Sequence, residues 1–295
     1  MQLVTIECRE VAGRPGALTR DGEILDLVAA PTTLDQAHWN PQSVISILAA
    51  GEDGRERVQR LLDQADEADA DALRSAGVLL PMNGTDLMAP VRRPGLVLVQ
   101  EHNEAAADEP DPVVAIKSPN TVVGPAKIVR LPWQSGEGTW VRPMLGAVLG
   151  RPLHLGAAEE AARAIVAWTL LFDISPPAPA SREDAAQWRR YLDSKQFPGA
   201  CPLGPALVTL DEWPGHKDAE CVWSVNGVEI GRARPPLDEL PQRLASLSTR
   251  YGFRPGDVVG FDLPMGRADQ RNGQDGDRVQ LALTDTMVLD TTLSF

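Results

Sequence analysis

Residues 87–99 read LMAPVRRPGLVLV, and this stretch divides the chain into two parts. Pro90 and Pro94 frame a linker, because proline fixes its own backbone and restricts the residue before it. The apolar run that follows, Leu96–Val99, is typical of a buried strand. We therefore predict a boundary between about residues 80 and 95. The expected domains are residues 1–85 and 86–295.

The part before the linker combines short strands with helices. The predicted strands are Leu3–Ile6, Gly16–Leu18 and Glu23–Leu27. Asp21-Gly22 separates the last two, and this dipeptide between apolar stretches is a strong hairpin signal. Apolar residues recur at helical spacing in Pro41–Ala50 and Arg55–Ala76. The first part is therefore expected to be a small α+β domain.

Strands dominate the part after the linker. The predicted strands are Leu96–Val99, Val113–Ile116, Ala126–Leu131, Met144–Leu149, Trp168–Ile174, Cys221–Val225, Val228–Ile230, Val258–Phe261, Val279–Leu283, Met287–Leu289 and Thr291–Leu293. The predicted helices are Glu159–Trp168, Ser181–Leu192 with Ser181 as N-cap, and Leu237–Leu247. Asn226-Gly227 marks a second hairpin. The sequence predicts an α+β fold that is mostly β.

Composition excludes several classes of function. The 295 residues carry 28 Lys+Arg against 41 Asp+Glu, a formal net charge of −13, which is unsuited to nucleic acid or an anionic membrane surface. Three cysteines without a C-x-x-C pair argue against a disulfide framework. The four histidines lack metal-ligand spacing. No signal peptide or membrane span is recognised, so we expect a cytoplasmic protein.

Several blocks occur in an order that resembles the fumarylacetoacetate hydrolase family. They are Leu87–Pro90, Lys117-Ser118-Pro119, Leu171–Ser175, Lys195-Gln196-Phe197, Pro202–Pro205, Pro255–Val258 and Gly276–Val279. The resemblance implies a β-rich C-terminal domain built as a mixed β-sheet roll, preceded by a small N-terminal α+β domain. It also implies a homodimer. Members of the family hold a divalent cation through an E-x-E pair and the aspartate of an N-D-V-S block, with a His and a Glu on a lid.

The chain departs from that pattern at the metal. The resemblance places the E-x-E positions on Arg142 and Met144, and only Asp173 remains of the three carboxylates. A guanidinium brings positive charge and a thioether is a soft ligand, so neither suits a hard cation. We therefore expect no metal and no other cofactor, and an ion pair between Arg142 and Asp173. In the lid block Asn103 remains, but the His and Glu positions hold Ala107 and Pro110.

Candidate site residues follow from this comparison. Arg142 and Lys195 would stabilise a developing enolate, and His102 is the candidate base. The catalytic candidates are Arg142, Lys195, His102 and Asp173, and the substrate-binding candidates are Asn103, Glu104, Lys117, Trp140, Met144, Pro202, Gly204, Asp262 and Gly266. Strand alternation places Trp140 on the face of Arg142. Glu101 is interpreted as a solvated loop acid.

Three functions are compatible with these residues. The first is an enzyme of secondary-metabolite biosynthesis that cyclises, isomerises or rearranges C–C bonds in an enolisable polyketide-like or β-dicarbonyl substrate without a metal. A cyclase that works by holding a reactive conformer needs few acid–base groups. The second is a metal-dependent hydrolase, isomerase or decarboxylase. The third is a non-catalytic protein that binds a small molecule.

Overall fold

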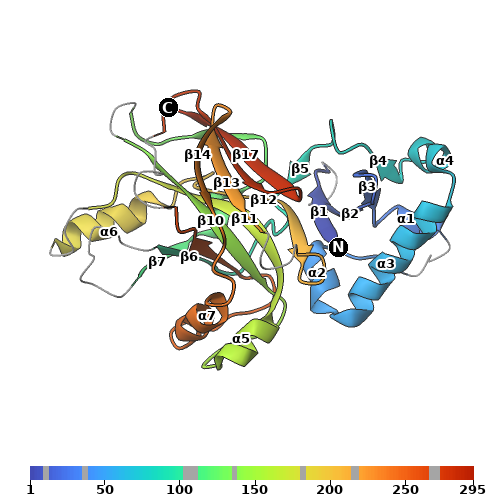
Figure 1. Cartoon of the computed structure of the whole chain (residues 1–295), viewed down its shortest axis with the longest axis horizontal. Coiled ribbons are helices and arrows are strands. Elements are labelled where there is room, and N and C mark those ends of the chain that lie inside the picture. Colours follow the sequence, from blue (N-terminus) through green and yellow to red (C-terminus); the bar gives the residue numbers. More distant parts are fainter. Residues whose placement is uncertain are drawn as a thin grey trace.

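Two β-sheets form the framework of the computed structural model, which describes residues 1–8, 13–34, 39–101, 112–134, 138–179, 184–213, 219–265 and 273–295. The large sheet has the strand order β4-β3-β2-β1-β12-β11-β10-β15-β6-β7, with β5 paired to β1 and β8 paired to β12. The small sheet has the order β14-β13-β16-β17-β9 and packs against β11 and β12 (Figure 1). This architecture confirms the predicted α+β class with mostly strands.

The strands are β1 (Gln2–Ile6), β2 (Arg14–Leu18), β3 (Ile24–Asp26), β4 (Leu79–Leu80), β5 (Leu87–Met88), β6 (Val97–Glu101), β7 (Val113–Lys117), β8 (Val122–Val123), β9 (Lys127–Arg130), β10 (Trp140–Leu149), β11 (Ile165–Ser175), β12 (Cys201–Thr209), β13 (Cys221–Val225), β14 (Val228–Ala233), β15 (Val258–Asp262), β16 (Arg278–Leu283) and β17 (Met287–Ser294). The helices are α1 (Ala30–Thr33), α2 (Val44–Ala49), α3 (Glu52–Glu67), α4 (Ala70–Ser75), α5 (Ala158–Ala164), α6 (Ala185–Ser194), α7 (Leu240–Ser248) and the 3₁₀ turn η1 (Pro119–Thr121). Most of these elements lie where the sequence predicted them.

The N-terminal part packs its helices on its own short strands. Apolar side chains of α2 and α3 share one buried cluster with β1 and β3. The predicted hairpin at Asp21-Gly22 is confirmed, since β2 and β3 pair antiparallel across it and Gly22 has a φ of 78°. β1 pairs antiparallel with β12, so the large sheet runs from this part into the next. The division at residue 85 stays a prediction.

Six strands of the large sheet close into a roll. The path β12-β11-β10-β15-β6-β7 continues through η1 into β8, which pairs parallel with β12 and so completes the ring. Side chains alternate between the two faces of each strand, so every second residue enters the roll. Gly146 and Gly260 pair across β10 and β15 where Leu171 enters, and a Cβ on Gly260 would lie 3.0 Å from that leucine. These glycines make room for the core.

The predicted boundaries of two helices were wrong. The helix predicted to reach Trp168 ends at Ala164, because Ile165 onward pairs with β10 and β12, and strand pairing overrides local helical periodicity. The helix predicted for Arg55–Ala76 is two helices, α3 and α4. It is interrupted at Ala68, which is extended, and Asp69 then caps α4 by accepting from the N–H groups of Asp71 and Ala72.

Other details of the sequence prediction also change. The N-cap of α6 is Asp184, whose carboxylate accepts from two backbone N–H groups of the first turn, whereas Ser181 lies outside the described residues. The two predicted C-terminal strands are one continuous strand, β17. The Asn226-Gly227 hairpin is confirmed, with positive φ at both residues. Among the helices that the structure describes, none is long and apolar enough to cross a membrane.

Candidate functional site

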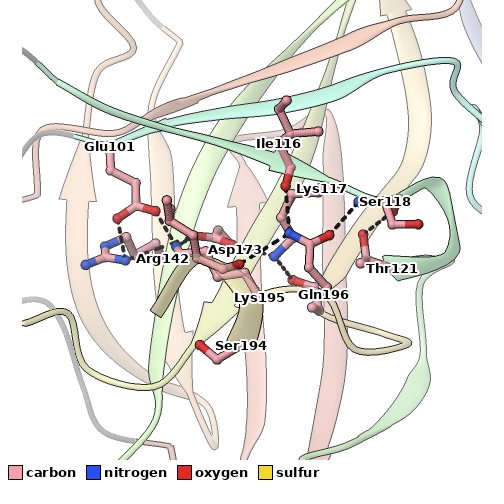
Figure 2. Close-up of polar contacts among 12 residues, drawn as sticks. Glu101, Ile116, Lys117, Ser118, Thr121, Arg142, Asp173, Ser194, Lys195 and Gln196 are labelled. Atoms are coloured by element: carbon pink, nitrogen blue, oxygen red, sulfur yellow. Dashed lines mark hydrogen bonds and ion pairs between the residues drawn. The ribbon is translucent and has the colours of Figure 1, made fainter. Parts of the chain in front are cut away.

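Five charged side chains and one tyrosine meet inside the roll, and we call them the ionic cluster. Figure 2 labels the five charged residues. The cluster consists of Glu101, Lys117, Arg142, Asp173, Tyr191 and Lys195. Strands β6, β7, β10 and β11 supply the first four, and α6 with its C-terminal residue supplies the last two. The solvent-exposed fraction of each of these residues is at most 6%. Charged residues are almost never buried this completely unless they are paired.

Asp173 is the anionic centre of the cluster. Its Oδ1 accepts from Lys117 Nζ at 2.5 Å and its Oδ2 accepts from Lys195 Nζ at 2.5 Å. Lys117 Nζ also donates to the carbonyl oxygen of Ala200 at 2.8 Å. Burial opposes the charged form of Asp173, but the two ammonium groups outweigh it and hold the pKa of this carboxyl well below its usual range. Asp173 is therefore ionised at neutral pH.

Glu101 is the second anion, and it joins the remaining cations. Its Oε1 accepts from Lys195 Nζ, and its Oε2 lies 2.8 Å from Nη1 of Arg142. Tyr191 accepts from the same Nη1 at 2.9 Å and donates its hydroxyl proton to Glu101 Oε2 at 3.0 Å. Glu101 is 3% exposed, so its interpretation as a solvated loop acid was wrong. It is buried because the roll closes around the end of β6.

Lys195 and Arg142 stay charged despite their burial. Burial works against the ammonium of Lys195, but Asp173 and Glu101 raise its pKa above its ordinary value. Burial likewise opposes the guanidinium of Arg142, and Glu101 does most to raise its pKa. Burial raises the pKa of the Tyr191 hydroxyl. The predicted contact between Arg142 and Asp173 exists at 4.0 Å, but the closer partner of Arg142 is Glu101.

Gln196 connects the segment that carries Lys195 to the segment that carries Lys117. Its Oε1 accepts from the backbone N–H of Ser118 at 2.8 Å, and its Nε2 donates to the carbonyl oxygen of Ile116 at 2.6 Å (Figure 2). These two backbone groups flank Lys117, and Gln196 itself follows Lys195 in the chain. One amide side chain therefore links the end of β7 to the end of α6.

The donor set does not fit a divalent cation. Mg²⁺, Mn²⁺ and Ca²⁺ prefer several oxygen ligands, and carboxylates supply most of them. Here the carboxylates of Glu101 and Asp173 each contact two or more cationic side chains. Arg142 and the fully buried thioether of Met144 stand where the resemblance places the other ligands. Within the described ranges, no group of three or more His, Cys, Asp or Glu side chains could hold a metal ion.

The other predicted site residues have varied positions. Trp140 lies on the face of Arg142 as predicted, with the guanidinium 4.5 Å from its ring centroid. Met144 belongs to the buried apolar cluster, and Asp262 lies 3.0 Å from Nη2 of Arg243. Pro202 and Gly204 are buried on β12. The remaining candidates, which lie outside the described residues, are His102, Asn103, Glu104 and Gly266.

Sequence reasoning missed the roles of Glu101 and Tyr191. Glu101 lies two and four residues after the buried Val99 and Val97 of β6, so strand alternation places it on the same face as these valines. Tyr191 precedes Lys195 by four residues, and this spacing places both on one side of a helical turn. Ser175 was also overlooked, although it follows Asp173 by two residues on the same strand and therefore shares its face. It is completely buried.

Comparison with known proteins gives consistent matches. The family model for the fumarylacetoacetate (FAA) hydrolase C-terminal domain matches residues 91–294. A mitochondrial oxaloacetate tautomerase of Homo sapiens is 31% identical over 204 residues, which is 66% of this chain and 64% of that protein. The chain thus matches less than two thirds of that relative's length.

Two solved structures share the fold over their whole length. Maleylpyruvate hydrolase from Sphingobium sp. SYK-6 has a TM-score of 0.74 at 20% identity, with 100% of this chain and 99% of that one covered. The same enzyme in complex with manganese(II) and pyruvate has a TM-score of 0.69 at 21% identity, with the same coverage. At these identities the likeness shows the fold.

Proposed function

Since the chain belongs to the fumarylacetoacetate hydrolase family, we propose that it is an enzyme for a small enolisable carbonyl compound and that it works without a divalent cation. The reaction is isomerisation, cyclisation or C–C rearrangement of a polyketide-like or β-dicarbonyl substrate in a biosynthetic pathway. The observation that supports this proposal is the ionic cluster, in which Lys195 lies between the carboxylates of Glu101 and Asp173. An ammonium group therefore occupies the position between the acidic side chains.

The charge of the cluster suits an enolate. Three cations face two carboxylates, so one positive charge is not balanced within the cluster. An ammonium carries three N–H donors, and the bonds to Glu101 and Asp173 account for two on Lys195. Nζ also lies 4.6 Å from the centroid of the Tyr191 ring, and the proposal is that an enolate oxygen accepts the third N–H when substrate is bound. Positive charge held in place in a dry site stabilises negative charge that develops in a transition state more strongly than in water.

A proton acceptor has to come from outside the cluster. The pKa of Asp173 is held low by the two lysines, so its carboxylate is a weak base. The pKa of Lys195 is held high, so its ammonium group keeps its proton at neutral pH. His102 remains the proposed base, since it directly follows Glu101 in the chain.

The same observation favours a second candidate, a non-catalytic protein that binds a small anion. Neither Asp173 nor Lys195 exchanges a proton readily near pH 7, because their pKa values are shifted in opposite directions away from it. If no residue beside the cluster replaces them, the site holds a ligand without converting it. Proton exchange on the bound ligand separates the two candidates.

The test is proton exchange at the carbon next to the carbonyl. Pyruvate and oxaloacetate, which the names of the relatives suggest as probes, are incubated with EDTA-treated protein in D₂O and followed by NMR. Catalysed exchange in EDTA supports the proposal. Exchange that appears only after Mn²⁺ is added supports the metal-dependent alternative instead. Binding by calorimetry without exchange supports the non-catalytic candidate.

Assembly and location extend the proposal. The family resemblance supports a homodimer that acts on a small-molecule substrate. The net charge of −13 argues against a nucleic-acid or anionic membrane partner, and the proposed location is the cytoplasm. Light scattering coupled to size-exclusion chromatography measures the assembly directly, and a mass of one chain would overturn the dimer.

A further inference from the structure

Helix α6 borders the ionic cluster but is itself hardly buried. Of its ten residues, all within the described ranges, only Tyr191 is buried. Trp188, Leu192 and Ser194 are half-buried, and the others are exposed. Figure 1 shows α6 at the end of the molecule opposite α3 and α4. A helix that packs on a protein core normally buries a whole stripe of apolar side chains, so α6 is weakly attached.

The hydroxyl of Tyr191 ties α6 to the cluster. It accepts from Nη1 of Arg142 at 2.9 Å and donates to Oε2 of Glu101 at 3.0 Å. The tyrosine ring lies 4.6 Å from Nζ of Lys195 and meets Trp188 edge to face. Arg142 and Glu101 also contact each other directly at 2.8 Å. Withdrawal of Tyr191 therefore leaves both ions paired, and it avoids the large cost of a buried ion without a partner.

The two ends of α6 are held differently. At the C-terminal end Gln196 is bonded to the backbone on both sides of Lys117. Lys195 is bonded to Asp173 at the same end. At the N-terminal end, the bonds that the structure describes for the Asp184 carboxylate come from two N–H groups of α6 itself. The C-terminal end is therefore the fixed point about which α6 can turn, while Lys195 keeps its place.

The other elements of the cluster are less able to move. Glu101, Lys117, Arg142 and Asp173 lie on β6, β7, β10 and β11, which are hydrogen-bonded to one another or to neighbouring strands of the large sheet. Moving one of these strands breaks a ladder of backbone hydrogen bonds, whereas α6 belongs to no ladder. Segments with few buried contacts open at the lowest free-energy cost. Since the cluster residues are at most 6% exposed, a ligand needs such an opening to reach them.

We propose that α6 is a gate over the ionic cluster and that the hydroxyl of Tyr191 is its latch. Release of Tyr191 lets α6 turn away about Gln196 and uncovers Arg142, Glu101 and Lys195. A detached helix of ten residues is not stable in water, so α6 loses its helical hydrogen bonds when it leaves the cluster. Tyr191 is a positioning residue, because it acts through the position of α6. The inference rests on the proposed function only for the ligand that passes the gate.

Amide hydrogen exchange of the whole protein, followed by mass spectrometry of its peptides, measures the opening without any ligand. In the wild type, the amides of α6 are expected to exchange faster than those of α3 and β11. Tyr191→Phe removes two hydrogen bonds and keeps the ring, so exchange in α6 is expected to rise at least about tenfold. Exchange in α3 and β11 is expected to stay at the wild-type rate. The matched control is Tyr251→Phe at the only other tyrosine of the chain, which is expected to leave exchange in α6 unchanged.

Modification of Arg142 by phenylglyoxal, also followed by peptide mass spectrometry, reports whether the opening uncovers the cluster. Its rate is proportional to the fraction of molecules in which α6 is open. In Tyr191→Phe it is therefore expected to rise by the same factor as the exchange in α6.

A pair of variants at Arg190 changes the stability of α6 and leaves the cluster residues intact, since Arg190 is exposed. Glycine has a lower helix propensity than alanine, and the difference corresponds to about a fivefold change in the opening equilibrium. Arg190→Gly is therefore expected to show about fivefold faster exchange in α6 than Arg190→Ala. Modification of Arg142 is expected to be faster by the same factor.

Four results would overturn the inference. Equal protection of α6 and β11 in the wild type would exclude the gate, and so would faster exchange in α6 with unchanged modification of Arg142. Unchanged exchange in Tyr191→Phe would exclude the latch. Exchange that rises equally in α6, α3 and β11 would also exclude it, because that result shows a loss of overall stability.

The gate and the proposed function fail separately, because none of these measurements uses a substrate. Opening as expected, without proton exchange on pyruvate or oxaloacetate, would uphold the gate and overturn the enzyme. Proton exchange in a protein whose α6 is as protected as β11 would uphold the enzyme and overturn the gate.

Discussion

The two ends of the roll interior are equally buried and chemically opposite. At one end the side chains of Val148, Leu171 and Leu203 are completely buried. At the other end the side chains of Lys117, Asp173 and Lys195 are also completely buried. Burying an aliphatic side chain stabilises the fold by about 1.5–3 kcal/mol. Removing an ion from water costs several kcal/mol, which only a well-placed partner returns.

This difference shows where the fold buries charged groups at a cost in folding free energy. An all-apolar interior would satisfy the requirements of folding, since apolar replacement of a buried ion pair is often neutral or stabilising. The charged end also contains two unpaired polar atoms, on Arg142 and Ser175, whereas the side chains at the apolar end need no partner. We therefore expect the apolar end to give the larger net stabilisation and the charged end to carry the proposed chemistry.

The largest expected effect is at the centre of the charged end. Asp173→Ala leaves the ammonium groups of Lys117 and Lys195 without their common partner, and this is expected to lower the free energy of unfolding by about 3–5 kcal/mol. Urea unfolding measures it. The control is Asp290→Ala, which removes a partner of the exposed Arg278 at 2.7 Å and is expected to cost about 0–1 kcal/mol.

Equal losses in the two variants would show that water reaches Asp173 and would remove the contrast between the two ends.

The apolar end is tested by Leu171→Ala. This leucine is fully buried beside Gly146 and Gly260, which have no side chains to fill the space it leaves. The expected loss is about 3 kcal/mol in urea unfolding, from lost burial and the remaining cavity. Leu210→Ala is the control, because Leu210 is 47% exposed, and a change within about 0.5 kcal/mol is expected.

Pyruvate affinity separates the ends further. It should survive Leu171→Ala and change in Asp173→Ala, because Asp173 holds Lys117 and Lys195 in position. Loss of affinity in both variants would mean that the two ends act as one unit.

The sequence was sufficient for most of the fold. Alternation and turn chemistry are local properties, so roll strands β6, β7, β10, β11 and β15 and the hairpins at Asp21-Gly22 and Asn226-Gly227 could be predicted. Strand β12 was missed, because it begins CPLGP and two prolines and a glycine are atypical of a strand. The end of α5 could not, because Ile165 and the residues after it pair with strands that lie far away in sequence. Helical spacing continues through that boundary, and only the partners decide it.

The site was predictable only where one strand carries it. Trp140 and Arg142 are two residues apart on β10, so alternation alone places them together. Glu101 contacts Lys195 across 94 residues, and Lys117 contacts Asp173 across 56. No local sequence pattern spans separations of this length. Glu101 is followed by the polar residues His102 and Asn103, so its sequence context is that of a loop, and closure of the roll makes it a buried ion.

The pH dependence of unfolding sharpens the comparison, because the apolar end does not titrate. The pKa of Asp173 in the folded protein lies below its ordinary value. As the pH falls below about 4, the unfolded chain therefore binds more protons than the folded protein does. Stability from Asp173 is present above that pH and is lost on further acidification. The folded pKa of Lys195 is raised, so its contribution is present below about pH 10 and is lost as the pH rises further.

Urea unfolding of the wild type and of Asp173→Asn at several pH values measures the acid side. The difference between the two proteins is expected to be constant from about pH 5 to 9 and to shrink below about pH 4. A difference that already falls between pH 7 and 5 would contradict the direction of the Asp173 shift.

The smallest expected effect is at the surface link that holds the charged end together. Gln196→Ala removes the hydrogen bonds from Ser118 N–H and to the Ile116 carbonyl, and a longer one to the Leu192 carbonyl at 3.4 Å. The side chain is exposed, so a loss of about 1–2 kcal/mol in urea unfolding is expected. Gln187→Ala is the control, since Gln187 is an exposed residue of α6, and its free energy of unfolding is expected to change by no more than about 0.5 kcal/mol.

Since Gln196 sets the distance between the segments of Lys117 and Lys195, pyruvate affinity should also fall in Gln196→Ala and not in Gln187→Ala. Unchanged affinity would show that the contacts with Asp173 alone position the two lysines.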